Sequence, residues 1–187
     1  MIQNNYKNNV IRPIQEQERG RAQGGRVLAS NIDASPTEAQ KSAGNYSKDH
    51  IHIHGLAITI ENAKGSMRSG IGKNGNYWSC KIPEAYGYIK KTEGADGDHL
   101  DVYIGPHKQS NKVFVVNQID PDTKQFDETK SFIGFRNLQH AVDTYTKAFS
   151  DGKGLQRIGS IVATDMPTFK EWVKSDNHHK PFVVPKH

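Results

Sequence analysis

The sequence predicts a mainly β domain of the α+β class, with two flanking helices near its C-terminus and an extended arm at its N-terminus. Three observations support this prediction. Short stretches of alternating apolar and polar residues recur between Gly, Pro and Asp turns, helical periodicity is confined to the C-terminal third, and large apolar side chains are scarce in the first 50 residues. Short strands joined by such turns favour a small antiparallel β-barrel of the OB-like kind.

The chain has 187 residues, of which 34% are hydrophobic, so it is long enough for one domain with a buried core and tails. We place the arm at residues 1–50, the barrel domain at 51–177 and a C-terminal tail at 178–187. The arm lacks the apolar surface to offset an ordering cost of about 1–2 kcal/mol per residue. Ser35, Pro36 and Glu38 nevertheless form a capping box, which predicts a short helix over residues 36–43.

The first expected strand contains His50, His52 and His54, which alternate and therefore share one face. Such a face would present imidazoles to zinc or copper, but a plain exposed strand face also accounts for these histidines, and no fourth ligand is close in sequence. Further strands are expected at residues 58–61, 102–104, 113–116 and 157–163, where apolar residues alternate or form short runs.

Helical spacing appears in two segments. Residues 137–150 place apolar side chains at helical intervals, with Asn137 as the expected N-cap and Gly152 beyond the C-terminal end. A second helix is expected near residues 167–174, where Phe169, Trp172 and Val173 pack inward.

An acidic cluster at residues 96–101 is the main candidate for chemistry. Asp96, Asp98 and Asp101 crowd into a short loop, where they repel each other unless a cation neutralises them. Carboxylate ligands favour Mg²⁺, Mn²⁺ or Ca²⁺ over zinc. Asp-Gly-Asp is also a common turn sequence. An EF-hand calcium loop fits poorly, because Asp101 is followed at once by an apolar run.

The same segment resembles a known family. The motifs Tyr86-Gly87-Tyr88-Ile89 and Asp96-Gly97-Asp98-His99-Leu100-Asp101 resemble the signature of the soluble family I inorganic pyrophosphatases, and the distance between the two motifs matches it without a gap. It looks closer still to pyrophosphatase-like domains of phage and mobile-element polyvalent proteins, and the resemblance covers about residues 54–175. It implies hydrolysis of pyrophosphate with two or more Mg²⁺ ions, or Mn²⁺ in their place.

The resemblance also implies roles for individual residues. The implied metal ligands are Asp96, Asp98, Asp101, Asp120, Glu128 and Glu61. The implied phosphate contacts are Lys64, Arg68, Lys130, Tyr145 and Lys147, with Tyr86 shaping the pocket and Asp98 taking the proton of the attacking water. Alternatives stay open: Asp122 in place of Asp120, Asp127 in place of Glu128, a solvated hairpin for the two basic residues at 64 and 68, and a core position for Tyr145.

Charge and composition limit the functions that the protein can have. The net charge of +5 invites a nucleic-acid interpretation, but the basic residues are spread along the chain and an anionic substrate explains part of the excess. No signal peptide or membrane-spanning stretch is visible, which predicts a cytoplasmic setting or carriage in a phage particle. Three functions therefore compete: a pyrophosphatase, a hydrolase of a nucleotide or another phosphoanhydride, and a non-catalytic particle or docking module in which residues 1–50 bind a larger assembly.

Overall fold

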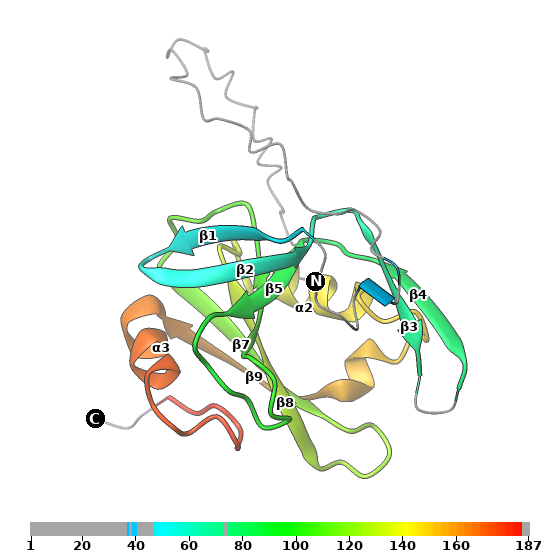
Figure 1. Cartoon of the computed structure of the whole chain (residues 1–187). Coiled ribbons are helices and arrows are strands. Elements are labelled where there is room, and N and C mark those ends of the chain that lie inside the picture. The colour runs from blue at the N-terminus through cyan, green and yellow to red at the C-terminus, as the bar shows by residue number, and fades with distance from the viewer. Residues whose placement is uncertain (1–36, 38, 41–46, 73–74, 185–187) are drawn as a thin grey trace, which may run out of the picture.

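A seven-stranded sheet forms the centre of the protein, and a separate two-stranded hairpin lies beside it (Figure 1). The structure, a computed structural model, describes residues 37, 39–40, 47–72 and 75–184. The large sheet has the order β1 (Asp49–Ile53), β2 (Leu56–Asn62), β5 (Ala85–Ile89), β6 (Asp101–Ile104), β8 (Phe126–Ile133), β7 (Lys112–Ile119) and β9 (Ile158–Asp165). The hairpin joins β3 (Met67–Ile71) and β4 (Tyr77–Lys81).

The prediction of a closed antiparallel barrel is not confirmed. Within the described residues the large sheet has two free ends, β1 and β9, and β6 runs parallel to β8, so the sheet is open and mixed. The chain passes from β6 to β7, which lies on the side of β8 away from β6. It then turns back into β8, which pairs antiparallel with β7 and parallel with β6. On its other side, β7 pairs with β9. Strand alternation in the sequence indicates which face a residue occupies, but it does not indicate which strands are neighbours.

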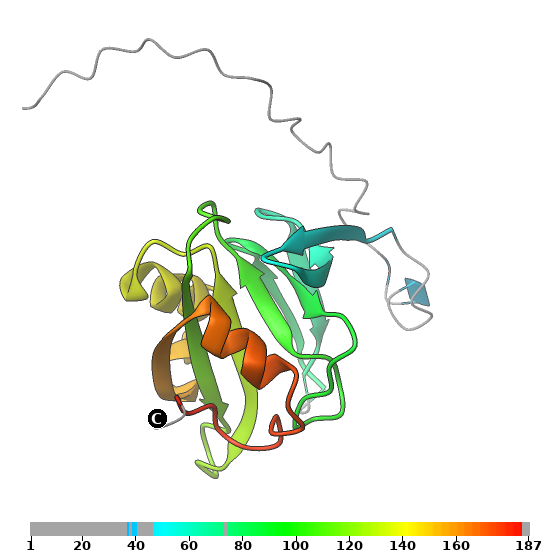
Figure 2. The same cartoon turned by 90° about the vertical axis from the view of Figure 1, so that its left-hand side faces the viewer.

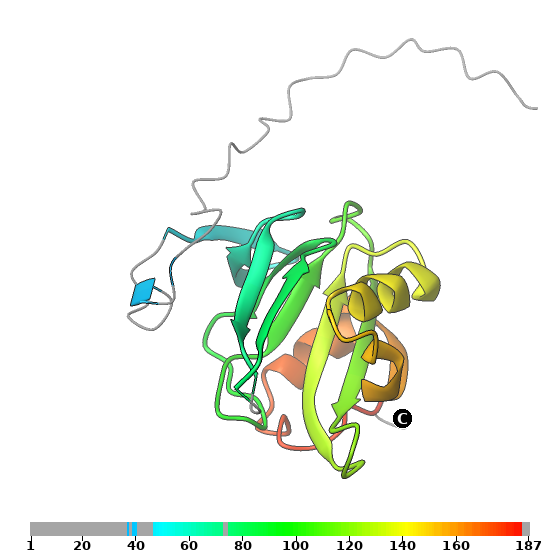
Figure 3. The same cartoon turned by 90° about the vertical axis from the view of Figure 1, so that its right-hand side faces the viewer.

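Two helices cover opposite faces of the sheet. Helix α3 (Met166–Val173) packs on the face that carries Val102 and Val113, whereas α2 (Leu138–Lys147) packs on the face that carries Tyr103 and Phe114 (Figures 2 and 3). Neighbouring residues of one strand point to opposite faces, so the central strands are buried on both sides. A short 3₁₀ helix, η1 (Gly154–Arg157), connects α2 to β9.

Both helices begin where the sequence predicts. The Asn137 side chain accepts a hydrogen bond of 2.9 Å from the backbone N–H of His140 and caps α2. Asp165 caps α3 in the same way, through a bond of 2.8 Å from the N–H of Thr168, and Pro167 stands in the first turn. Most of the short helix expected over residues 36–43 lies outside the described residues.

Strand β1 begins at Asp49, inside the last two residues of the expected arm. His50 and His52 are exposed on this strand, and the Nδ1 of His50 lies 3.1 Å from the hydroxyl of Thr59. His54 leaves the strand in a turn with φ of 49°, and its Nε2 lies 3.1 Å from the backbone oxygen of Ser110. The three imidazoles are therefore not presented together on one strand face. No helix in the described part of the chain is long and apolar enough to cross a bilayer.

Gly87 permits the close approach of β5 to β2. A Cβ at this position would lie 1.9 Å from the backbone oxygen of Thr59, and the backbone of a central strand cannot move away cheaply. We expect Gly87→Ala to lower the free energy of unfolding by about 3 kcal/mol or more. Gly152→Ala is the matched control, because Gly152 has φ of 70° with nothing within 4 Å, and left-handed strain alone costs about 1–2 kcal/mol. Equal losses for the two variants in urea unfolding would contradict this account.

Candidate active site

An acidic pocket of about 410 Å³ lies where β2, β5, β6 and β8 meet the loop before β6. Five carboxylate residues and three cationic residues line it together with two tyrosines and a histidine: Glu61, Asp96, Asp98, Asp101, Glu128, Lys48, Arg68, Lys130, Tyr86, Tyr88 and His99. Side chains alternate between the two faces of a strand, and this alternation places the strand residues of the pocket on one face of the sheet. Asp101 lies on the same face of β6 as Tyr103, which packs against α2, and Glu128 and Lys130 share one face of β8. The pocket is thus the polar end of the sheet face that packs against α2.

The loop before β6 is held by its own side chains. The Thr92 hydroxyl donates to the Ile89 carbonyl at 2.6 Å and accepts from the Leu100 N–H at 3.0 Å, while the Leu100 side chain is buried. The Nδ1 of His99 lies 2.5 Å from the Thr92 carbonyl oxygen, and the His99 ring stacks on Tyr88 with centroids 4.6 Å apart. These contacts fix both ends of the loop.

The aspartate segment of this loop is a turn as well as an acidic surface. The Asp96 carboxylate accepts a hydrogen bond of 3.1 Å from the Asp98 N–H, and Gly97 takes a φ of 86°, as the turn interpretation requires. Asp96 and Asp98 are nevertheless exposed and line the pocket. Turn formation and display of carboxylates are therefore compatible here.

Lys130 is the central cation of the pocket. Parallel pairing of β6 with β8 sets Lys130 opposite Asp101, and its Nζ donates to the Asp101 carboxylate. The same Nζ lies 2.6 Å from Glu128 Oε2 and 3.3 Å from the Tyr86 hydroxyl. Because Lys130 is only 9% exposed, water screens these interactions weakly.

Burial and this lysine set the protonation states around it. Burial alone would raise the pKa of Asp101, but the Lys130 ammonium outweighs it and holds that pKa below its usual value. Burial would lower the pKa of Lys130, yet Asp101, Tyr86 and Glu128 together raise it well above the ordinary value. Burial raises the pKa of Glu128 and lifts that of Tyr86 far above its usual range. At neutral pH, Lys130 and Asp101 are therefore charged, and the Tyr86 hydroxyl keeps its proton.

Two further cations stand at the edge of the pocket. The Arg68 guanidinium lies 4.9 Å from the centroid of the Tyr86 ring and 5.6 Å from that of the Trp78 ring, which fixes its direction. Lys48 donates to Glu61 Oε1 at 2.8 Å and lies 5.5 Å from the centroid of the Tyr88 ring. Both side chains offer positive charge to an anion bound among the carboxylates.

Tyr145 reaches the site indirectly. Its ring is fully buried, and its hydroxyl donates to Gln118 Oε1 at 2.7 Å. The amide nitrogen of Gln118 donates to Asp127 Oδ2 and Glu128 Oε1, both at 2.8 Å. The core position that helical spacing predicts for Tyr145 is thus the observed one, and its hydroxyl orients two carboxylates through Gln118.

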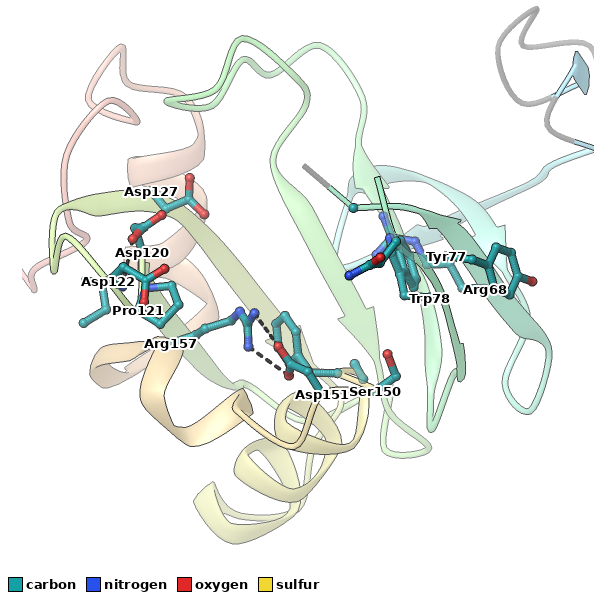
Figure 4. Close-up of a pocket in the computed structure, with 15 residues that line it drawn as sticks. Arg68, Tyr77, Trp78, Asp120, Pro121, Asp122, Asp127, Ser150, Asp151 and Arg157 are labelled. Atoms are coloured by element: carbon teal, nitrogen blue, oxygen red, sulfur yellow. Dashed lines mark hydrogen bonds and ion pairs between the residues drawn. The ribbon is translucent and has the colours of Figure 1, made fainter. Parts of the chain in front are cut away.

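Three other sequence candidates do not line the acidic pocket. Asp120 lies in the turn after β7, where its Oδ1 accepts from the N–H groups of Asp122 and Thr123, and it lines a neighbouring pocket of about 700 Å³ (Figure 4). Lys64 donates to the buried Glu84 at 2.8 Å. Lys147 is exposed at the end of α2.

Sequence reasoning missed Lys48 and Tyr88 as lining residues. Tyr88 could have been found, because alternation places it on the same strand face as Tyr86. Lys48 carries no such signal, because it precedes β1 and falls within the expected arm.

The donor set suits a hard divalent cation, since all five acidic ligands offer carboxylate oxygens. As arranged, three of these carboxylates bind lysines instead: Asp101 and Glu128 bind Lys130, and Glu61 binds Lys48. Among the described residues, no three His, Cys, Asp or Glu side chains are gathered tightly enough to ligate one ion. Ligation by three or more of them would therefore require side chains to rotate away from these lysines.

The family model for Inorganic Pyrophosphatase matches residues 38–174, more than half of the chain, and the protein therefore belongs to this family. The family resemblance of the Tyr86 and Asp96 motifs is thereby confirmed. Among solved structures, the chain is similar to an inorganic phosphatase from Anaplasma phagocytophilum, with 17% identity and a TM-score of 0.33, covering 68% of this chain and 90% of that chain. No curated protein matches the chain.

Proposed function

We propose that this protein hydrolyses inorganic pyrophosphate to two phosphates in a Mg²⁺-dependent reaction. One observation carries the proposal: the three aspartates of the family motif share a single pocket with Glu61, Glu128 and the cations Lys48, Arg68 and Lys130. A polyphosphate substrate needs cations around its oxygens, and a divalent ion needs carboxylates, so a pocket that holds both suits their joint binding.

The residues that would hold Mg²⁺ are the exposed Asp96 and Asp98, with Asp101, Glu128 and Glu61 joining as their lysine contacts loosen. Bound Mg²⁺ supplies charge neutralisation of the phosphates and lowers the pKa of a water molecule. Mn²⁺ has similar ligand preferences and would serve in its place. Asp120, or its neighbour Asp122, would contribute only from the adjoining pocket.

Side chains of the protein accept the proton and bind the phosphate oxygens. Asp98 accepts the proton of the attacking water, because it is the exposed middle carboxylate of the loop. Lys130 and Arg68 bind phosphate oxygens. The neutral Tyr86 hydroxyl, whose oxygen accepts from Lys130, donates its proton in a hydrogen bond to a phosphate oxygen. Lys64 would reach the leaving phosphate only by leaving Glu84, and Lys147 only by extending from the end of α2.

A substrate panel tests this proposal. Phosphate release should be measured for the full chain with Mg²⁺ against pyrophosphate, nucleotides and sugar nucleotides. Hydrolysis of pyrophosphate is the expected result. Turnover of another phosphoanhydride alone would select the second candidate function, and no turnover at all would favour a non-catalytic module built on this fold.

Binding of Mg²⁺ should also raise the melting temperature. Carboxylates that repel one another are stabilised when a cation binds the folded state only, and the gain grows with the logarithm of ligand concentration. We expect a shift of several degrees at millimolar Mg²⁺, with K⁺ at equal ionic strength as the control. An unchanged melting curve would argue against a metal site in this pocket.

We propose that residues 1–46 dock the protein to a partner or to a larger assembly such as a phage particle. We also propose that the protein acts in the cytoplasm. Because Lys48 lines the acidic pocket and β1 begins at Asp49, a chain that starts at Ser47 should keep full turnover. A chain that starts at His50 loses the Lys48 contact and should turn over more slowly. Loss of turnover in the first truncation would mean that residues 1–46 contribute to catalysis.

A further inference from the structure

A second pocket of about 700 Å³ adjoins the acidic pocket (Figure 4). It lies between the β3–β4 hairpin on one side and, on the other, the β7–β8 turn and the segment from α2 to η1. In Figure 4, Arg68 and Trp78 stand on the hairpin side, while Asp120, Asp122 and Arg157 stand across the opening. Apart from Arg68 and the carboxylate of Asp120 or Asp122, the proposed hydrolysis of pyrophosphate uses no group of this pocket.

The two pockets share one lining residue. Arg68 lines both of them, and its guanidinium is held between the Trp78 and Tyr86 rings at the junction. The buried Gln118 links one carboxylate of each pocket, because its amide donates to Asp127 of the second pocket and to Glu128 of the acidic pocket. An anionic group bound beside Arg68 would therefore face both pockets.

The charge of the second pocket argues against more phosphate there. Four carboxylates line it, Asp120, Asp122, Asp127 and Asp151, against the two guanidinium groups of Arg68 and Arg157. The Arg157 guanidinium already donates two hydrogen bonds, of 2.8 and 3.1 Å, to the Asp151 carboxylate. The pocket suits an uncharged group that donates N–H or O–H bonds to carboxylates.

The pocket also offers flat surfaces. Trp78 contributes an indole from the hairpin. Opposite it, the Arg157 guanidinium lies over the Phe149 ring at 4.6 Å from the centroid, and the bonds to Asp151 hold its plane. Planar cations and indoles of this kind stack on aromatic heterocycles.

We propose that this second pocket binds the nucleoside of a nucleoside 5′-diphosphate, with the α-phosphate at Arg68 and the β-phosphate in the acidic pocket. The base stacks against Arg157, and the ribose hydroxyls donate to the aspartates. This inference rests on the proposed function, because the same site cleaves the anhydride. The oxygen of water bonds to the β-phosphorus, the bond from that phosphorus to the bridging oxygen breaks, and nucleoside monophosphate, phosphate and one proton are released.

The test compares two substrates on one protein. We expect the full chain with Mg²⁺ to hydrolyse at least one of ADP, GDP, CDP and UDP. Arg157→Gln should lower the ratio of kcat/KM for that nucleotide to kcat/KM for pyrophosphate by about tenfold, the size of one stacked cationic contact. Lys153→Gln is the matched control, because it removes a charge beside the same 3₁₀ helix without lining the pocket, and it should leave the ratio unchanged.

Direct calorimetric titration of the wild-type chain with each nucleotide keeps the two proposals separable. Hydrolysis of pyrophosphate without binding or turnover of any of the four nucleotides would overturn this inference and leave the proposed function intact. Binding of a nucleotide that Arg157→Gln weakens, without hydrolysis of pyrophosphate, would support the pocket and reject the proposed function. Nucleotide turnover with an unchanged ratio in Arg157→Gln would also overturn the inference.

Discussion

Replacing Asp98 by asparagine is expected to lower the rate of pyrophosphate hydrolysis by about 10²- to 10⁴-fold, because the substitution removes the proposed proton acceptor. Loss of one carboxylate charge for the metal would add to this effect. The fold should be retained, because the Asp98 side chain is exposed and asparagine is equally favourable in a turn. Initial rates at saturating Mg²⁺, with melting curves on the same samples, measure both expectations.

Asp143→Asn is the matched control for this substitution. It removes an exposed carboxylate from α2, where Asp143 Oδ1 accepts from the Gln139 side chain at 2.8 Å, away from the acidic pocket. The control should leave turnover unchanged. Retention of more than half of the activity by Asp98→Asn would exclude Asp98 as the proton acceptor.

The second large effect is expected for Lys130→Met. Removal of this buried ammonium leaves Asp101 and Glu128 without their cation, and breaking a buried ion pair from one side typically costs about 3–5 kcal/mol. Turnover should also fall, because a phosphate contact is lost. Added Mg²⁺ should raise the melting temperature of this variant more than that of the wild-type chain, because the ion replaces the missing positive charge.

Lys64→Met provides the comparison for Lys130→Met. Lys64 also pairs with a glutamate at 2.8 Å, but its own side chain is 63% exposed, and His140 Nε2 lies 3.3 Å from the same carboxylate of Glu84. Water and His140 therefore remain beside Glu84 when Lys64 is removed, and the loss should be smaller than for Lys130→Met. Urea unfolding without metal measures both variants. Equal losses would mean that the environment of Lys130 is not the reason for its effect.

The elements of the fold could be predicted better than their arrangement. Asn137 marks the start of α2, and Pro167 and the spacing of Phe169 and Trp172 indicate α3, because caps and helical periodicity are local signals. The expected end of the first helix was wrong, since α2 ends at Lys147, before the expected limit at residue 150 and five residues before Gly152. The neighbours of each strand could not be predicted, because alternation is the same for a barrel and for an open mixed sheet. The parallel pairing of Asp101 with Lys130 follows from the long-range placement of β7.

The sequence predicted residues of the acidic pocket both inside and beyond the ungapped motif, since Glu61, Arg68, Glu128 and Lys130 also line it. Asp96, Asp98, Asp101 and Tyr86 come together because one loop and two adjacent strands carry them. The assignment of Asp120 depended on the length of a turn, and that of Tyr145 on the rotation of a helix, so their positions required the structure. Lys48 enters the pocket only through tertiary packing.

Dependence on Mg²⁺ is tested most directly by titrating the ion into the 187-residue chain with pyrophosphate and measuring phosphate release. We expect no phosphate release in the presence of a chelator and a rate that rises and saturates at millimolar Mg²⁺. Absence of phosphate release at every Mg²⁺ concentration, or a rate that the chelator does not change, would contradict this expectation.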